Sequence, residues 1–161
     1  MLVLGFDPGT ALTGYGLVSK DGSWLIPVNY GVIRTTAKTC FADRLVQIYR
    51  EADEIIARFR PQAVAVEEVF FNNNAKTFST VSQARGALIL AAALRGIEVA
   101  EYTPLQVKQA VVGYGQAEKQ QVQKMVKSIL RMEDIVRPDD AADALAIAIC
   151  HIHSCQGDRF R

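Results

Sequence analysis

The sequence lacks the features expected of an exported or membrane-inserted protein. Its longest apolar run, residues 86–94, is too short to cross a bilayer, and no basic segment followed by a cleavage site opens the chain. Its three cysteines are an odd number, so a disulfide framework is not expected and the thiols should be reduced. We therefore expect a cytoplasmic protein with no membrane association.

The chain also has little net charge, +1 for 161 residues, so the total indicates no partner. Half of the residues are apolar, which predicts one packed domain over residues 1–153 with a short tail over 154–161. The charge is unevenly distributed, because five cations between Thr103 and Arg131 stand against the single acid Glu118. They are Lys108, Lys119, Lys124, Lys127 and Arg131. This basic segment is either a solvated helix face or a surface for backbone phosphates.

Histidine is scarce, and both histidines fall in the tract CHIHSC at residues 150–155. On a helix, Cys150 would share a face with His153, and His151 would share a different face with Cys155. Four ligands on two faces cannot close a tetrahedron around zinc. A structural zinc site is therefore not expected in this tract.

The most informative feature that is present is a carboxylate at the end of an apolar run. Residues 2–6 predict a short strand, and Pro8-Gly9 turns the chain directly after Asp7. Asp7 could cap that turn through its side chain, as aspartate often does, or it could take part in chemistry at the sheet edge. This stretch alone leaves both interpretations open.

The pattern of the remaining chain predicts a mixed α/β domain. Strands are predicted over residues 13–19 and 24–33, joined by a hairpin at Asp21-Gly22, so the first three strands should form an antiparallel meander. Further strands are predicted over 63–66 and 97–102, and helices over 41–59, about 77–94, 104–112, about 117–131 and from Pro138 onwards.

Two more acids, Glu67 and Glu68, follow the strand of residues 63–66. Because a helix precedes that strand, it most simply adds parallel to the first strand, which places these acids at the same sheet edge as Asp7. Neighbouring residues on a strand face opposite ways, so only one of the two can share the site of Asp7. The small residues Ala63 and Ala65 would share a face with Glu67, which favours Glu67, although the pattern alone leaves both open.

The last helix begins with three acids, Asp139, Asp140 and Asp143. Acids in a first helical turn are favoured by the helix dipole, and this explanation suffices for Asp139. Asp143 lies among alanines on a nearly all-apolar helix, so it should be partly buried and need a compensating partner such as a divalent cation. Carboxylates clustered without histidine or thiol ligands favour Mg²⁺ or Mn²⁺ over zinc.

Two further features suggest contacts with an anionic polymer. Lys119 stands in the first turn of its predicted helix, against the helix dipole, which indicates an anionic partner such as a phosphate. Phe70 and Phe71 introduce a polar loop, where they could stack on bases or, as is commoner, pack into the core.

Several separated motifs follow one another along nearly the whole chain. They are GFDPGT at residues 5–10, TGYG at 13–16, VEEVF at 66–70, QARG at 83–86, QVKQ at 106–109, GYG at 113–115, AEK at 117–119 and DAADALA at 140–146. Together they closely resemble the RuvC family, the bacterial Holliday-junction resolvases.

That resemblance implies an RNase H-like α/β fold, with a mixed five-stranded sheet flanked by helices. It also implies a homodimer that works beside the RuvA–RuvB branch-migration complex. The implied activity is Mg²⁺-dependent resolution of four-way DNA junctions by paired, symmetric nicks, with two ions per site, Mn²⁺ as a substitute, and 5′-phosphate and 3′-hydroxyl ends.

The resemblance also assigns individual residues. The family's catalytic and metal-binding carboxylates fall on Asp7, Glu67, Asp140 and Asp143. Its DNA-binding residues fall on Phe70, Lys108 and Lys119. This assignment selects Glu67 rather than Glu68.

Two other classes of protein fit part of the sequence. Asp-x-Gly-Thr at a strand end also occurs in actin-like ATPases, but those proteins need two such domains and a second phosphate loop, for which 161 residues leave no room. A non-catalytic junction-binding protein, whose acids only cap and pair, would bind the same DNA without Mg²⁺-dependent nicking.

Overall fold

A computed structural model of the protein describes residues 1–70 and 75–157, so Phe71 lies outside the described residues. In chain order the elements are β1 (Leu2–Asp7), β2 (Leu12–Asp21), β3 (Trp24–Arg34), α1 (Phe41–Phe59), β4 (Ala63–Glu67), α2 (Ala75–Ala93), β5 (Glu98–Tyr102), α3 (Pro104–Val112), α4 (Lys119–Ile129) and α5 (Asp139–Gly157). Each predicted strand and helix is present, with ends shifted by a few residues.

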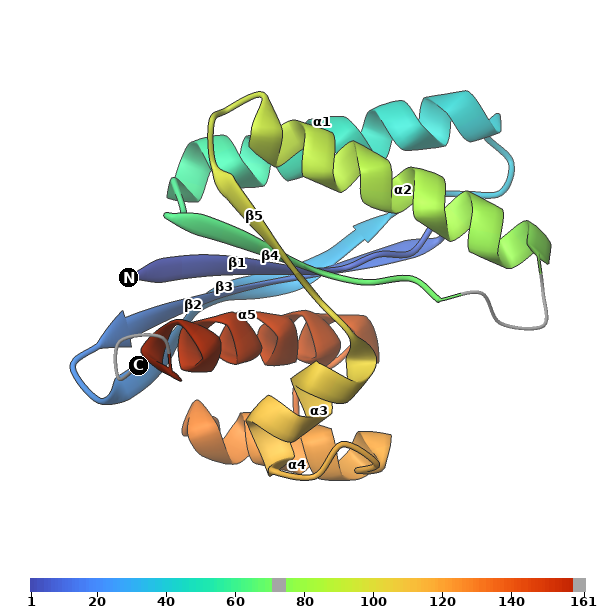
Figure 1. Cartoon of the computed structure of the whole chain (residues 1–161). Helices are drawn as coiled ribbons and strands as arrows, with labels where there is room; N and C mark the ends of the chain where they lie inside the picture. Colours follow the sequence, from blue (N-terminus) through green and yellow to red (C-terminus); the bar gives the residue numbers. More distant parts are fainter. Residues whose placement is uncertain (71–74, 158–161) are drawn as a thin grey trace.

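The strands form one mixed sheet in the order β3-β2-β1-β4-β5 (Figure 1). The first three strands pair antiparallel, as the hairpin signal predicted. β4 pairs parallel with β1, and β5 pairs parallel with β4. β1 is therefore the central strand, and the carboxyl ends of β1 and β4 lie side by side.

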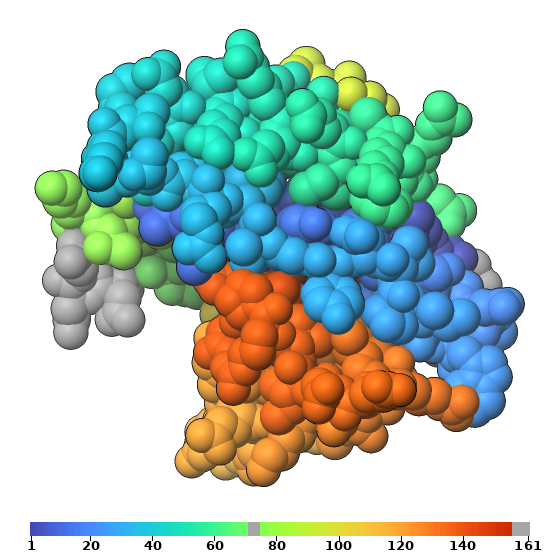
Figure 2. Space-filling view, turned by 180° about the vertical axis from the view of Figure 1, so that it is seen from behind, coloured from blue at the N-terminus to red at the C-terminus, as the bar shows by residue number. Residues whose placement is uncertain are grey.

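Helices cover both faces of the sheet. Figure 1 shows α1 and α2 on one face and α5 on the other, with α3 and α4 forming an outer layer against α5. Figure 2 shows the opposite side of the molecule, where the edge strand β3 lies between α1 and the layer that contains α4. The core has two parts, one on each side of the sheet.

The side chains of β4 alternate between these two cores. Val64 and Val66 are buried against α1 and α2, whereas Ala65 is buried on the α5 side. Glu67 has the same parity as Ala65 and lines a cavity on the α5 side, as the spacing of small residues predicted.

Local sequence explains where α3 begins and ends. The Thr103 hydroxyl accepts the N–H of Gln106, and the Gln106 side chain accepts the N–H of Thr103, so the predicted cap is a reciprocal capping box. The helix ends at Gly113, whose φ of 81° lies in the left-handed region that favours glycine.

Glycines let α5 pack directly on the backbone of the sheet. A Cβ at Gly5 would lie 2.1 Å from the carbonyl oxygen of Ala144, and a Cβ at Gly14 would lie 1.9 Å from the carbonyl oxygen of Asp140. Gly14 is also the β2 partner of Asp7. The first turn of α5 is therefore held against the end of β1.

The far end of α5 continues to Gly157, so the domain boundary predicted after residue 153 falls within this helix. Within residues 1–70 and 75–157, no helix is both long enough and apolar enough to span a membrane.

The contact at Gly14 is open to a direct test. In Gly14→Ala, the new Cβ would overlap the Asp140 carbonyl unless the start of α5 moved away. We expect the free energy of unfolding to fall by about 1–3 kcal/mol, the usual cost of an overpacked contact. Urea denaturation measures this loss, and an unchanged midpoint and slope would contradict the close approach of α5 to β2.

Candidate active site

Two of the predicted acids end neighbouring parallel strands. Asp7 is the last residue of β1, and Glu67 is the last residue of β4. Phe6 and Val66, the residues before them, are partners in the β1–β4 register, so the two acids lie next to each other at one edge of the sheet. Both side chains are partly buried.

The first two turns of α5 bring the other two acids, Asp140 and Asp143, to the same place. Burial raises the pKa of Asp7 well above its ordinary value, and the charges of Glu67, Asp143 and Asp140 raise it further. Each of these carboxylates is therefore close enough to Asp7 to disfavour its ionised form. The fold thus brings together all four of the acids that the sequence predicted.

Glu67 occupies the most distinctive electrostatic environment. Burial raises its pKa to about 7, and the Asp143 charge adds to the shift, while Lys108 and Lys119 act against it. Its carboxylate borders a cavity of about 240 Å³, whose walls also include Lys108, Lys119 and Asp143. The predicted DNA-binding lysines therefore line the space beside the acids.

Lys119 forms an ion pair with the acidic cluster. Its ammonium nitrogen lies 2.9 Å from Oδ2 of Asp143 and 3.7 Å from Oδ2 of Asp139. The sequence indicated an anionic partner for this first-turn lysine, and the structure identifies two carboxylates. Burial raises the pKa of Asp143, while the hydrogen bond and charge of Lys119 partly offset that rise.

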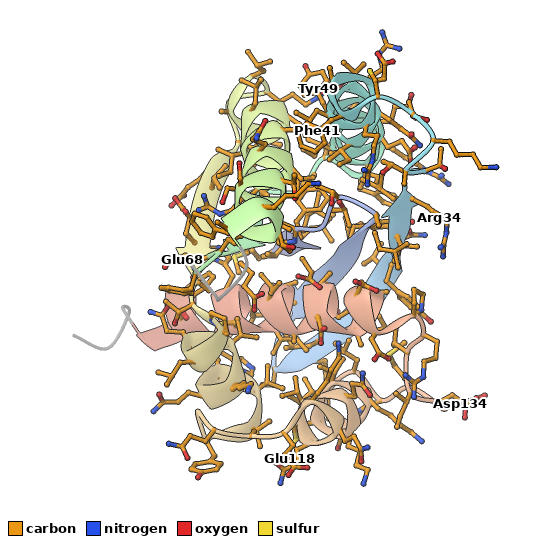
Figure 3. The ribbon with its side chains drawn as sticks, turned by 90° about the vertical axis from the view of Figure 1, so that its right-hand side faces the viewer. Arg34, Phe41, Tyr49, Glu68, Glu118 and Asp134 are labelled. Atoms are coloured by element: carbon orange, nitrogen blue, oxygen red, sulfur yellow. The ribbon has the colours of Figure 1, made fainter. Side chains whose placement is uncertain are left out.

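Glu68 follows directly after β4, where its main chain is bonded to β5. Its N–H donates to the carbonyl oxygen of Tyr102, 2.9 Å away, which ties the start of the following segment to β5. Figure 3 shows Glu68 at the end of β4, at the margin of the molecule. Glu68 is not among the groups that shift the pKa of Asp7. The geometry therefore places Glu67 and not Glu68 beside the cavity, a choice that the strand pattern alone left open.

The donor set suits a hard divalent ion, because all four groups are carboxylates. In the present side-chain arrangement, however, no three histidine, cysteine, aspartate or glutamate side chains within residues 1–70 and 75–157 are placed to hold one metal ion. One oxygen of Asp143 is bonded to the Lys119 ammonium instead. The backbone thus gathers suitable ligands, and a shared ion would require some of their side chains to turn.

The side chain of Phe70 is 56% exposed, so it does not pack into the core. It lies only three residues beyond Glu67, in the segment between β4 and α2. Core packing, the commoner use of such an aromatic, is therefore wrong for Phe70. Its role as a base-stacking residue stays a prediction.

The CHIHSC tract serves the structure of α5. The His151 ring bonds to the Tyr102 hydroxyl at 2.9 Å and to the Cys155 sulfur at 3.5 Å. Nδ1 of His153 lies 3.0 Å from the carbonyl oxygen of Ala110. These histidines therefore bond to residues of β5, α3 and α5 itself. Within the described residues, Cys40, Cys150 and Cys155 form no disulfide.

Sequence reasoning missed what holds the acids in place. Gly14 and Gly16 stand two residues apart on β2, and a Cβ added at either would overlap atoms of α5. Alternate glycines on a strand, together with an alanine-rich helix, are a signal of close packing that the motif TGYG contained. The QARG motif contains Arg85, whose Nε donates a hydrogen bond to the carbonyl oxygen of Glu67, a role that no local pattern indicates.

The sheet is an antiparallel meander extended by two parallel strands, and acids stand at the ends of β1 and β4 and on the facing helix α5. This arrangement defines an RNase H-like domain with an acidic site. A family model described as crossover junction endodeoxyribonuclease RuvC matches residues 3–151. The chain belongs to the RuvC family of crossover junction endodeoxyribonucleases. This assignment confirms the resemblance to the RuvC family and the predicted fold. It excludes the alternative that the chain is an actin-like ATPase.

Individual relatives agree with the family model. The RuvC protein of Syntrophomonas wolfei is 58% identical over 154 residues, which cover 96% of this chain and 90% of the relative. The structure of Thermus thermophilus RuvC superimposes with a TM-score of 0.92 at 38% identity, covering 98% of this chain and 97% of that one. A second Thermus thermophilus RuvC structure, in complex with a Holliday junction substrate, gives a TM-score of 0.90 at 36% identity over 98% and 96% of the two chains.

The raised pKa of Glu67 predicts a change in stability. In the folded protein Glu67 keeps its proton up to about pH 7, whereas in the unfolded chain it loses the proton near pH 4.5. Ionising Glu67 in the folded protein therefore lowers the free energy of unfolding, and this loss develops as the pH rises from 4.5 to 7. Glu67→Gln removes that cost. In the absence of divalent ions at pH 8, we expect the free energy of unfolding to rise by about 1–3 kcal/mol, and the gain to fall toward zero near pH 4.5.

Urea denaturation in a chelating buffer at the two pH values measures this gain. Glu68→Gln is the matched control, because it neutralises the adjacent acid outside the cluster and should leave stability unchanged. A gain in both variants, or in neither, would contradict the electrostatic account of Glu67.

Proposed function

We propose that this protein is a structure-selective endonuclease that resolves four-way DNA junctions by paired, symmetric nicks during homologous recombination and repair. The single observation that carries this proposal is the gathering of four carboxylates at the ends of β1 and β4 and the start of α5. Family membership supports it, and so does the Thermus thermophilus relative, whose structure contains a Holliday junction substrate.

The carboxylates serve as ligands for Mg²⁺, with Mn²⁺ able to substitute and two ions per site. Asp7 and Glu67 provide ligands from the sheet, and Asp140 and Asp143 provide ligands from α5. Ions held by these carboxylates would supply an activated water and would stabilise the leaving oxygen of the phosphodiester, which would leave 5′-phosphate and 3′-hydroxyl ends. The carboxylates also relieve their mutual repulsion by sharing cations.

The cationic and aromatic groups around the site hold the DNA. Lys108 and Lys119 lie in the cavity wall beside Glu67, where their charges can contact backbone phosphates. The Lys119 side chain is 53% exposed, so its ammonium group can leave Asp143 and bind a phosphate instead. Phe70 is exposed beyond the end of β4 and can stack on an unpaired base near the junction centre.

Asp7→Asn tests the assignment of the acids. It removes a central ligand, so we expect cleavage of a mobile four-way junction to fall by about 1,000-fold or more, which corresponds to several kcal/mol of lost metal stabilisation. Junction binding should be kept or tightened, because one negative charge is removed. The assay compares the junction with linear duplex of the same sequence, each with and without Mg²⁺, and follows binding by gel shift.

In the same assay, Glu68→Gln should cut like the wild type. Cleavage by Asp7→Asn at the wild-type rate would overturn the metal assignment. Tight binding of the junction by the wild type, with no Mg²⁺-dependent nicking, would identify a non-catalytic junction-binding protein instead.

We also propose that the protein acts as a homodimer, in the cytoplasm, beside the RuvA–RuvB complex. Paired nicks need two sites, and the described residues of one chain supply one carboxylate cluster. The outward face of α2 supports a role as the dimer contact. Leu90 is 51% exposed, Leu94 just beyond the helix is 66% exposed, and a Cβ at Gly86 would meet no described atom within 4 Å outside its own stretch of helix.

Leu90→Glu tests this contact. Two-fold symmetry would bring the added carboxylates of the two chains close together on α2, so we expect a shift from dimer to monomer at micromolar concentration and loss of symmetric cutting. Sedimentation velocity measures the shift. Val46→Glu, at an exposed position on α1, is the control and should remain a dimer. A wild-type protein that sediments as a monomer while it nicks junctions symmetrically would refute the proposal.

A further inference from the structure

Arg85 on α2 contacts the last residue of β4. Its Nε donates a hydrogen bond to the main-chain carbonyl oxygen of Glu67 at 3.2 Å, and its guanidinium forms an ion pair with Glu101 on β5. The Arg85 side chain is only 21% exposed. One guanidinium therefore joins a helix on one face of the sheet to the ends of two neighbouring strands.

The Glu67 carbonyl lies where regular strand pairing stops. The β4–β5 register ends with Glu67 opposite Tyr102. The next residue on that side, Thr103, caps α3 and gives its N–H to the Gln106 side chain instead of extending the ladder. The end of β4 is therefore held by a side-chain donor as well as by the sheet.

We propose that Arg85 is a positioning residue for the nuclease reaction, which acts by fixing the backbone at Glu67. The carboxylate of Glu67 faces α5 and the acidic cluster, whereas Arg85 holds the same residue's carbonyl from the α2 side. Among the described residues, Arg85 does not line the cavity and forms no ion pair with a carboxylate of the cluster. This inference rests on the proposed function of Glu67 as a metal ligand.

The rigid fork of the guanidinium explains why arginine is suited to this position. It can donate to the Glu67 carbonyl and to the Glu101 carboxylate at the same time, in fixed directions. A lysine ammonium could keep the ion pair with Glu101, but its single nitrogen at a different reach would not hold both partners in the same geometry. The two contacts of Arg85 can therefore be separated by conservative substitutions.

Arg85→Lys and Glu101→Gln form the discriminating pair. Arg85→Lys should lower junction cleavage in Mg²⁺ by about 10- to 100-fold, the usual effect of losing a group that orients a ligand. It should weaken Mn²⁺ binding without DNA, measured by calorimetry, by a similar factor, and leave junction affinity in Ca²⁺ unchanged. Glu101→Gln keeps the donor to Glu67, so its cleavage rate and Mn²⁺ affinity should stay within about threefold of wild type.

A purely structural ion pair predicts the reverse pattern. In that case Arg85→Lys would retain activity and Mn²⁺ affinity, and Glu101→Gln would lose them together with thermal stability. That result would overturn the positioning role. Failure of the wild-type protein to nick junctions would instead refute the proposed function, so the two failures are distinguishable.

Discussion

Mutual repulsion among partly buried carboxylates is the constraint on which the rest of the structure depends. Asp7, Glu67 and Asp143 all have raised pKa values, with burial as the first cause and neighbouring acids as a further one. Ionising such a cluster costs free energy that packing elsewhere must offset. The proposed divalent ions would offset this repulsion when the site binds a phosphodiester substrate.

The scaffold offsets this cost with contacts that lie outside the cluster. Gly5 and Gly14 let α5 approach the sheet backbone, so the first turns of the helix cannot drift away from β1. Arg85 holds the end of β4 from the opposite face. Lys119, which lies on α4, neutralises part of the negative charge of the cluster. Each acid therefore sits on a strand or helix, and among the described residues Lys119 is the cation that pairs with a carboxylate of the cluster, through a side chain exposed enough to move.

The sequence predicted the parts of this arrangement that depend on local pattern. The strand before Asp7, the parallel strand before Glu67 and the capped helix at Thr103 follow from periodicity and turn chemistry, and all are present. For Lys119, the sequence predicted an anionic partner but could not identify it as Asp143. The contact between Arg85 and Glu67 joins residues on different elements, and no local signal specifies which carbonyl a guanidinium reaches.

The choice between Glu67 and Glu68 shows the same division between local and long-range information. Alternation along β4 states that only one of them faces α5, and tertiary packing decides which. The resemblance to the RuvC family selects Glu67, and the geometry places Glu67 beside the cavity on the α5 side.

The most direct measurement is the position of Mn²⁺ in crystals of the protein, located by its anomalous scattering. We expect density between Asp7 and the acids of β4 and α5, with Asp143 turned from Lys119 toward the ion. Mn²⁺ bound only elsewhere on the molecule, with Asp143 still paired to Lys119 and Asp7 without a metal contact, would contradict the account.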